Sequence, residues 1–340
     1  MKRKLLLSIF ALFLTGIIQA QDNQQAELAY NRGVQKFMSK DIAGSIVEYT
    51  SAIELKSGFI SAIYNRGIAK TEIKDYAGAI ADFNNVITAE PSNARAMFAR
   101  GFAKINQSDF NGALEDFSAS IISGNKNANV YYYRGVSKFM QNNIDGAMKD
   151  FDKAIEIKPD YAYAYHDLAS SYRKKGNLEA SESNYKKAIE NNSKLDFAYN
   201  NLGSIQKEMK KFNDANQAFD KTLSLNPDYY IAVNNRGLSK IESGDYKGAI
   251  EDFNKAIKNK DNFAPAYNNR GIAKIKSKDY KGACADFTKA IEINPKYANA
   301  YANRGYSKEM LRDFKGSNVD WKKAIELGVK NPESYKGSFN

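Results

Sequence analysis

The chain has 340 residues, of which 43% are apolar and 26% are charged, and its formal net charge is +11. This is the composition of a soluble protein. With one cysteine, the chain cannot form an internal disulfide, and with one histidine it lacks the residues for a histidine- and cysteine-rich metal site. His166 and Cys284 are 118 residues apart in the sequence, so cysteine–histidine catalysis is not expected.

The first 20 residues have the three parts of a secretory signal peptide. Lys2, Arg3 and Lys4 precede an apolar run that continues to Ile18, and a small residue, Ala20, stands at the expected cleavage site. The apolar run is too short to span a bilayer comfortably, although an uncleaved anchor is the alternative. We therefore expect cleavage after Ala20 and an exported protein, periplasmic or secreted, without a transmembrane span.

Signal removal leaves 47 basic against 39 acidic residues, a net charge of +8. Such an excess can favour acidic partners or an anionic membrane surface. Solvated helix faces are the favoured interpretation, and a nucleic-acid partner is not expected. The lone Cys284 is interpreted as a small apolar packing residue rather than a reactive thiol.

Small residues recur every 34 positions through the rest of the chain. They are Gly33, Gly67, Gly101, Gly135, Ala169, Gly203, Gly237, Gly271 and Gly305. A fixed period of this length predicts an array of stacked helical repeats. After a short lead over residues 21–25, nine units span residues 26–331, with starts at 26, 60, 94, 128, 162, 196, 230, 264 and 298; residues 332–340 form a tail.

Each unit contains two helical patterns separated by a turn, for example at residues 75–78. Asp75 is placed to cap the second helix with its carboxylate. A proline follows four of the second helices, at Pro91, Pro159, Pro227 and Pro295, where it cannot continue a helix.

Two further positions of the second helix also repeat. One holds a small residue, namely Ser45, Ala79, Ala113, Ala147, Ser181, Ala215, Ala249, Ala283 and Ser317. The other, four residues later, holds an aromatic one, namely Tyr49, Phe83, Phe117, Phe151, Tyr185, Phe219, Phe253, Phe287 and Trp321. Together with the glycine series, this pattern resembles the tetratricopeptide repeat family. The resemblance implies an all-α fold, a right-handed superhelical solenoid of helix–turn–helix repeats whose first helices line the concave face.

Seven units depart from the family pattern in a coordinated way. Where the family usually has leucine before the glycine and an aromatic residue four positions on, they have arginine and lysine, as in Arg236 and Lys240. The residue before the second-helix aromatic is then acidic, as in Asp252. Because the three positions change together, we predict an ion pair that joins the two helices of each unit. A basic ladder facing a ligand is the alternative.

The two middle units, residues 162–229, revert together. They carry Leu168 with Tyr172 and Asn184, and Leu202 with Gln206 and Ala218, and they lose the turn glycine, with Ala180 and Asp214 in its place. A local change in stability or curvature, and a junction between duplicated blocks, both explain this divergence.

Two rows of polar and aromatic residues are predicted on the first helices. The first row, two residues before the glycines, consists of Asn31, Asn65, Asn201, Asn235, Asn269 and Asn303. The adjacent row consists of Tyr30, Tyr64, Phe98, Tyr132, His166, Asn200, Asn234 and Asn268. Amides can both donate to and accept from a peptide backbone, so these rows predict a groove for an extended protein segment. The alternative is that they only solvate and pack the first helices.

No catalytic motif was found: the chain has no phosphate-cradling glycine loop, metalloprotease helix motif or nucleophile elbow. We therefore expect a non-enzymatic scaffold without cofactor or metal, which binds a protein or peptide segment. Two alternatives are a structural self-assembling array and an accessory subunit of a cell-envelope enzyme or secretion complex. The short tail, anchored only by Tyr335 and Phe339, forms no full capping helix, so homo-oligomers would form through this end.

Overall fold

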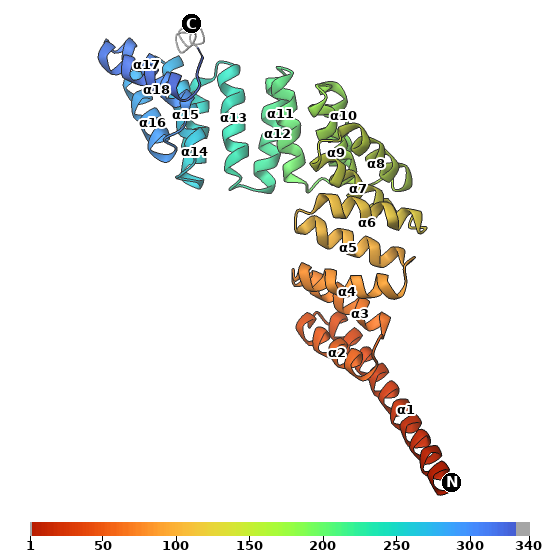
Figure 1. Cartoon of the computed structure of the whole chain (residues 1–340). Helices are drawn as coiled ribbons and strands as arrows, with labels where there is room; N and C mark the ends of the chain where they lie inside the picture. Colours follow the sequence, from red (N-terminus) through yellow and green to blue (C-terminus); the bar gives the residue numbers. More distant parts are fainter. Residues whose placement is uncertain (1, 331–340) are drawn as a thin grey trace. The chain divides into compact units, whose positions relative to one another are not determined.

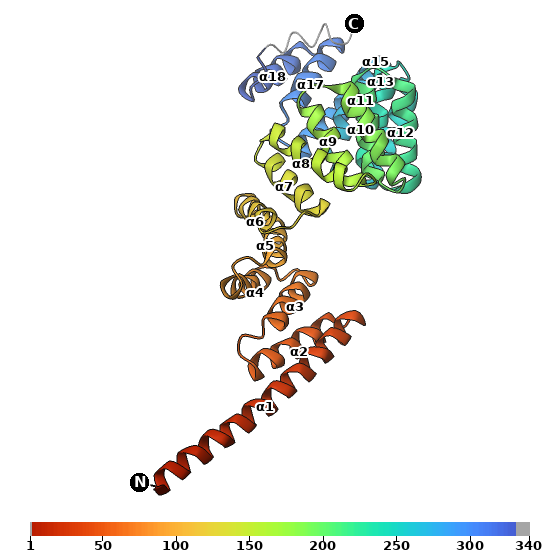
Figure 2. The same cartoon turned by 90° about the vertical axis from the view of Figure 1, so that its right-hand side faces the viewer.

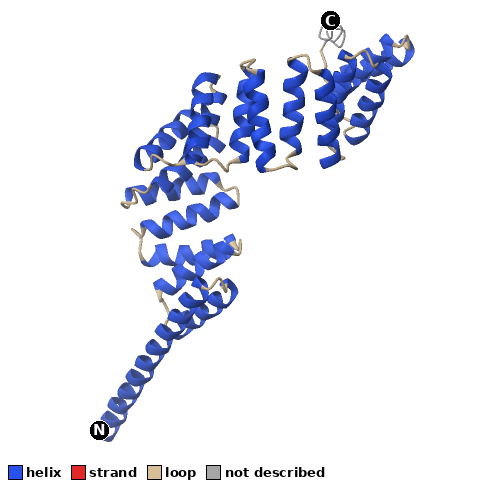
Figure 3. Cartoon of the chain, turned by 180° about the vertical axis from the view of Figure 1, so that it is seen from behind, coloured by secondary structure: helices blue, strands red, loops and turns tan. Residues whose placement is uncertain are grey.

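The computed structural model describes the backbone of residues 2–330 and the side chains of residues 19–330. The apolar side chains of the predicted signal segment up to residue 18, the predicted end of the last unit at Asn331, and the tail with Tyr335 and Phe339 lie outside the described residues. Over the described part the chain is helical and has no strand (Figure 3). Among the residues searched, no helix is long and apolar enough to cross a membrane.

The described residues form eighteen helices, labelled in Figure 1. They are α1 (Lys2–Met38), α2 (Ile42–Leu55), α3 (Ile60–Glu72), α4 (Tyr76–Ala89), α5 (Ala94–Asn106), α6 (Phe110–Ile122), α7 (Ala128–Met140), α8 (Ile144–Ile157), α9 (Ala162–Lys174), α10 (Leu178–Asn191), α11 (Asp196–Glu208), α12 (Phe212–Leu225), α13 (Tyr230–Glu242), α14 (Tyr246–Asn259), α15 (Ala264–Lys276), α16 (Tyr280–Ile293), α17 (Ala298–Met310) and α18 (Phe314–Glu326).

The chain divides into two compact units, each made of several of the 34-residue repeats, with the boundary inside α9. The first unit is residues 1–171 and the second unit is residues 172–340. From here on, each 34-residue element is called a repeat. In each unit an odd-numbered helix pairs with the even-numbered helix that follows it, and the resulting hairpins stack in chain order (Figures 1 and 2). Consecutive odd-numbered helices also touch, such as α3 with α5 and α13 with α15. The first helices of the repeats therefore form the more tightly packed layer within each unit.

The glycine series lets the two helices of a hairpin approach closely. A Cβ atom on Gly67 would lie 2.7 Å from Cε1 of Phe83, and one on Gly237 would lie 2.7 Å from Cε1 of Phe253. Both rings are fully buried. The aromatic side chain of the second helix thus packs directly against the backbone of the first, which explains why the two series recur together.

The turn inside most hairpins ends in a side-chain helix cap, as predicted; α12 is the exception, because Lys211 stands at its N-cap and makes no such bond. The Gly78 N–H donates to the Asp75 carboxylate at 3.0 Å, and a Cβ atom on Gly78 would lie 2.2 Å from that carboxylate. Glycine at this position therefore leaves room for the cap. The same bond forms in α2, α6, α14, α16 and α18, and asparagine supplies it in α8 and α10.

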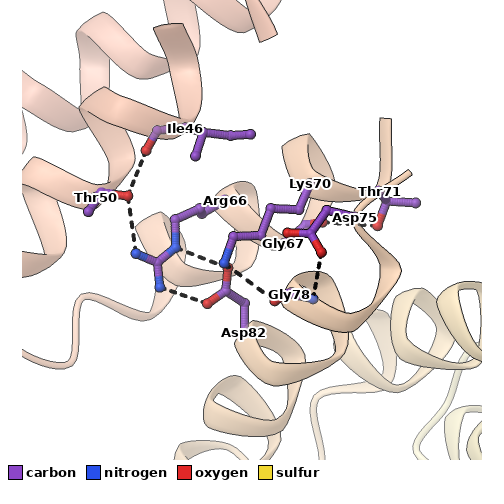
Figure 4. Close-up of polar contacts among 9 residues, drawn as sticks. All are labelled: Ile46, Thr50, Arg66, Gly67, Lys70, Thr71, Asp75, Gly78 and Asp82. Atoms are coloured by element: carbon purple, nitrogen blue, oxygen red, sulfur yellow. Dashed lines mark hydrogen bonds and ion pairs between the residues drawn. The ribbon is translucent and has the colours of Figure 1, made fainter. Parts of the chain in front are cut away.

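The predicted ion pair is present in all seven repeats and includes the lysine. Figure 4 shows the cluster of the second repeat, with Arg66, Lys70 and Asp82. Arg66 donates from Nε and Nη2 to the two oxygens of Asp82, at 3.0 and 2.7 Å, and Lys70 Nζ lies 2.8 Å from the same carboxylate. The Asp82 side chain is only 3% exposed. Two cations from the first helix therefore compensate one buried carboxylate of the second.

The arginine also reaches the preceding repeat, a contact that the sequence analysis did not foresee. Its Nη1 donates to the residue that follows the aromatic in the second helix of that repeat. The pairs are Arg66 with Thr50 at 3.2 Å, Arg100 with Asn84 at 2.7 Å, Arg236 with Asp220 at 2.5 Å, Arg270 with Asn254 at 2.6 Å and Arg304 with Thr288 at 3.0 Å. One guanidinium group thus joins three helices.

We expect Asp252→Ala to lower the free energy of unfolding by about 3–5 kcal/mol, because it leaves Arg236 and Lys240 without their buried counter-charge. The matched control is Asp220→Ala, which removes a carboxylate bound to the same arginine but 61% exposed. Its expected cost is below about 1 kcal/mol. Urea unfolding followed by circular dichroism measures both losses.

A triple variant tests whether the loss comes from the stranded charges. The variant combines Arg236→Leu, Lys240→Tyr and Asp252→Ala, so the three positions carry residue types found there in the middle repeats. It should lower the free energy of unfolding by less than Asp252→Ala alone, because no charge is left unpaired. Equal losses for the single and triple variants would contradict the ion-pair explanation.

Candidate partner-binding surface

Residues at the positions of the two predicted rows contact each other between neighbouring repeats, including Asp167, which stands in the first row where other repeats have asparagine. The Nδ2 of Asn65 donates to the hydroxyl of Tyr30 at 3.1 Å, and the hydroxyl of Tyr132 donates to Asp167 at 2.9 Å. In both pairs, a residue three positions before one glycine meets the residue two positions before the next. This pairing was not predicted from the sequence, although a common spacing of 35 residues connects the two positions.

In the second unit the same pairing produces a ladder of amides. Asn235 donates to Asn200 at 3.1 Å, Asn269 donates to Asn234 at 3.0 Å, and Asn303 donates to Asn268 at 3.0 Å. The buried members, with their exposed fractions, are Asn200 at 6%, Asn234 at 5%, Asn268 at 5%, Asn269 at 9% and Asn303 at 2%. These amides bind one another across repeats and offer little surface to a partner, while Asn201 and Asn235 keep partial exposure.

In the first unit the corresponding residues are more open. Tyr30, Tyr64, Phe98 and Tyr132 are half-buried, and Asn31 is exposed. The Phe98 ring packs on Phe117 with centroids 5.7 Å apart, so one face is held by the second helix. Burial raises the pKa of Tyr64 and of Tyr132, which keeps both hydroxyls protonated at neutral pH.

His166 belongs to a small polar cluster of the first unit. Its Nδ1 lies 2.8 Å from Oδ1 of Asp167, whose other oxygen accepts the hydroxyl of Tyr132. Across the described residues, no three histidine, cysteine or acidic side chains converge as a metal site. The cluster is therefore best described as a hydrogen-bonded contact between α7 and α9.

Two pockets of the first unit occupy equivalent places in the repeat. The first, about 280 Å³, includes Tyr30, Ser61 and Tyr64 in its lining. The second, about 430 Å³, includes Phe98 and Asn129, which stand two repeat lengths after Tyr30 and Ser61. Each pocket thus combines an aromatic ring of a first helix with the start of the next first helix.

The rims of these pockets carry different charges. Glu90 and Arg95 border the first pocket, and Lys158, at the position equivalent to Glu90, borders the second. Of the predicted binding residues, Tyr30, Tyr64 and Asn65 come together in the first pocket and Phe98 lines the second. Sequence analysis did not identify the loop residues of either rim, because their approach depends on how the repeats stack.

Four family models of the tetratricopeptide repeat match the chain, over residues 128–161, 151–182, 200–265 and 264–297. Two of the matched segments, 128–161 and 264–297, each cover one hairpin, α7–α8 and α15–α16. The chain is a tetratricopeptide repeat protein. A comparison with curated protein sequences gives no match.

Solved structures show the same fold. The repeat protein is similar to a tetratricopeptide repeat protein from Parabacteroides merdae, at 19% identity and a TM-score of 0.55, over 74% of this chain and 97% of that one. It is also similar to PilF from Pseudomonas aeruginosa, at 19% identity and a TM-score of 0.53, over 62% of this chain and 97% of that one. A third similar chain comes from the Cut9–Hcn1 hetero-tetramer of APC/C, at 14% identity and a TM-score of 0.55, over 92% of this chain and 75% of that one. These similarities show that the chain has the fold of these helical repeat structures.

The middle of this tetratricopeptide repeat protein contains a buried acid that the sequence analysis missed. The Glu182 side chain, 8% exposed, lies 2.7 Å from Lys186 and 2.6 Å from Lys211, and it accepts a bond from Gln206 at 3.3 Å. Lys211 and Gln206 belong to the following repeat, so this cluster joins repeats rather than the helices of one hairpin. The signal was an acid where other units have apolar residues such as Ile80 and Ile250.

Burial raises the pKa of Glu182, but the bonds from Lys186, Lys211 and Gln206 outweigh it and lower the pKa from 4.5 to about 2. A carboxyl whose pKa is depressed by folding stabilises the protein above its unfolded pKa. That stability is lost as the pH falls through the window between 4.5 and about 2.

We therefore expect Glu182→Gln to cost about 3 kcal/mol at neutral pH, with the difference from wild type shrinking between about pH 5 and pH 2. Urea unfolding at several pH values measures this difference. Glu179→Gln, at an exposed position in the first turn of the same helix, is the control and should show a small difference at every pH. A Glu182→Gln loss that does not change with pH would contradict the assignment.

Proposed function

We propose that this protein is an exported, non-enzymatic scaffold that binds an extended segment of a partner protein along the first helices of its first unit. The observation that supports the proposal is the recurrence of one pocket type at an interval of two repeats. A partner chain that places side chains in both pockets contacts the protein over several repeats, which is how solenoid surfaces achieve specific binding.

The pockets favour apolar or aromatic side chains flanked by polar backbone. Tyr30 and Tyr64 provide ring surface in the first pocket, and Phe98 provides it in the second. Asn65 and Asn129 stand beside these rings with amide groups that can bond to a peptide backbone. The first rim carries the opposite charges of Glu90 and Arg95, and the second carries Lys158, so the second pocket favours an acidic side chain of the segment.

The amide residues of the second unit take a different part in this proposal. Because Asn234, Asn268, Asn269 and Asn303 bond to one another and are buried, we assign them to holding neighbouring repeats together. The binding role proposed from the sequence is kept for the first-unit residues that line pockets.

A second candidate function is self-association through the last repeat. Helix α18 leaves Phe314, Val319 and Ile325 between 54% and 63% exposed, which is apolar surface at the end of the described array. This surface favours a structural assembly over a groove binder.

The first experiment fills both pockets by substituting one exposed residue in the lining of each. Ser61→Arg with Asn129→Arg should abolish crosslinked capture of a partner from envelope extract, because long side chains then fill both pockets. The matched control, Asn85→Arg with Thr88→Arg, adds the same charge at exposed positions of α4 and should retain capture. Circular dichroism checks folding.

Capture by both double variants would contradict binding at the pockets. Sedimentation of the same proteins separates the second candidate, because self-association through α18 would persist in the pocket variant.

Export has its own test. The described helix α1 runs without a break from Lys2 to Met38, so cleavage after Ala20 would leave residues 21–38 as the first helix of the array. We expect the protein isolated from the envelope or medium to begin at Gln21 by mass spectrometry. A chain that keeps Lys2, Arg3 and Lys4 in the cytoplasmic fraction would contradict export.

A further inference from the structure

Lysines form a row along the second helices of the later repeats. Two residues after the second-helix aromatic, the first three repeats have Ser51, Asn85 and Ala119, whereas the remaining repeats all have lysine. These lysines are Lys153, Lys187, Lys221, Lys255, Lys289 and Lys323. All of them except Lys153 are exposed. Because the hairpins of the second unit stack in chain order, equivalent positions of neighbouring repeats there lie side by side.

The row belongs to a broader basic surface on α14, α16 and α18. Positions eight and four residues before the lysine of the row, and three residues after it, lie on the same side of a helix. On these three helices, the four positions hold Lys247, Glu251, Lys255, Lys258, Lys281, Ala285, Lys289, Glu292, Lys315, Val319, Lys323 and Glu326, all exposed. We call this set the lysine surface. It has seven lysines against three glutamates, a net charge of +4.

Ion pairs along the helices do not explain the lysine surface. Lys289 Nζ lies 3.1 Å from Glu292, and Lys323 Nζ lies 2.9 Å from Glu326. Such exposed pairs contribute little to stability. In α14 the position of that glutamate holds Lys258, so two lysines stand one turn apart and repel each other.

Neighbouring charged groups leave the excess of positive charge in place. The cap carboxylates Asp245, Asp279 and Asp313 lie at the starts of these helices and accept glycine N–H groups. Asp220, on the flanking α12, is bound by Arg236. Exposed groups at the ends of the three helices and beside the surface on α18 are mostly basic, namely Lys260, Asp261, Lys278, Lys296, Arg312, Lys322 and Lys330.

The first unit shows that these positions do not need lysine to form the outer side of a hairpin. On α2, α4 and α6 the same positions hold Ala43, Val47, Ser51, Glu54, Ala77, Ala81, Asn85, Thr88, Asn111, Glu115, Ala119 and Ile122. This set has no lysine and two glutamates, a net charge of −2. The two units therefore present opposite charges at equivalent positions, and contact with water alone does not account for the lysines.

The residue types of the lysine surface favour a lipid surface over a folded protein. Protein interfaces are enriched in aromatic residues and arginine and depleted of lysine. The lysine surface has no aromatic residue and no arginine, while Arg236, Arg270 and Arg304 of the last three repeats are held in the ion clusters. Ammonium groups on long flexible stems suit a partner with many negative charges and no fixed geometry.

We propose that the lysine surface docks the second unit on a membrane that contains anionic phospholipids. Lysines of neighbouring repeats contact lipid phosphates together, so the attraction adds along the row. The contact is peripheral, and it involves none of the pockets of the first unit. It therefore goes beyond the groove proposed above and does not depend on it.

The test is cosedimentation of the full protein, as isolated from the cells that produce it, with phospholipid vesicles. The protein should bind vesicles made of equal amounts of phosphatidylcholine and phosphatidylglycerol, and added salt should weaken this binding. Binding to phosphatidylcholine alone should be at least about tenfold weaker. Equal binding to both compositions, or binding to neither, would overturn the proposal.

Two matched variants test whether the lysine surface is responsible. Neutralising exposed lysines of this surface, with Lys247→Gln, Lys255→Gln, Lys258→Gln and Lys281→Gln, should weaken binding to the mixed vesicles at least about tenfold. The control removes the same charge at exposed positions elsewhere, with Lys40→Gln, Lys74→Gln, Lys126→Gln and Lys194→Gln, and should bind like wild type.

Equal binding by the two variants would refute the assignment of the surface. Binding to polyglutamate in place of the mixed vesicles would assign the surface to an acidic protein and overturn the lipid partner. Circular dichroism checks folding, and should the surface variant fail to fold, the two vesicle compositions still decide on the wild-type chain.

Discussion

The stacking of this array depends on a carboxylate in the second helix of seven repeats, which is buried in six of them and partly exposed at Glu48. In the interior such a charge is costly unless it is paired and hydrogen-bonded. Arg66 and Lys70 show how the array meets this requirement, because both bind Asp82 from one face of the first helix. Since the guanidinium also bonds to Thr50 of the previous repeat, the group that neutralises one hairpin positions the next. Ionic pairing within a repeat and contact between repeats are thereby coupled.

The parts of the fold that lie within one repeat were predictable from the sequence. Gly67 and Phe83, or Arg66 and Asp82, are each 16 residues apart, and their contact requires only that two helices form a hairpin. The 34-residue period repeats such pairs many times. The positions of arginine, lysine and the acidic residue change together among the repeats, and this correlation predicts that the three side chains are in contact. The cap at Asp75 is local and was predicted for the same reason.

Contacts between repeats were not predicted, because they depend on the rotation and spacing of stacked hairpins. Asn235 and Asn200 were both identified as surface residues, yet they bond to each other across a repeat boundary. Glu182 was missed because its partners Gln206 and Lys211 lie in the next repeat. In each case the stacking of the repeats decides whether these side chains face solvent or one another.

The same first-helix positions have different structural roles in the first and in the second unit. Where the row holds Asn234 and Asn268, the amides satisfy one another and close the surface; where it holds Tyr30, Tyr64 or Phe98, one ring face packs and pockets form beside the ring. A similar contrast separates the repeats of the middle. The fifth places Tyr172 four residues after Leu168, whereas the sixth has Gln206 after Leu202 and lines a pocket with it. Seven repeats place an ion cluster between their two helices, and the fifth has Tyr172 at the position of the lysine. The sixth repeat has neither the ions nor an aromatic residue there, so it differs most from the others. There, Gln206 donates to the buried Glu182 of the preceding repeat, so the position that holds an ion cluster elsewhere takes part in a contact between repeats.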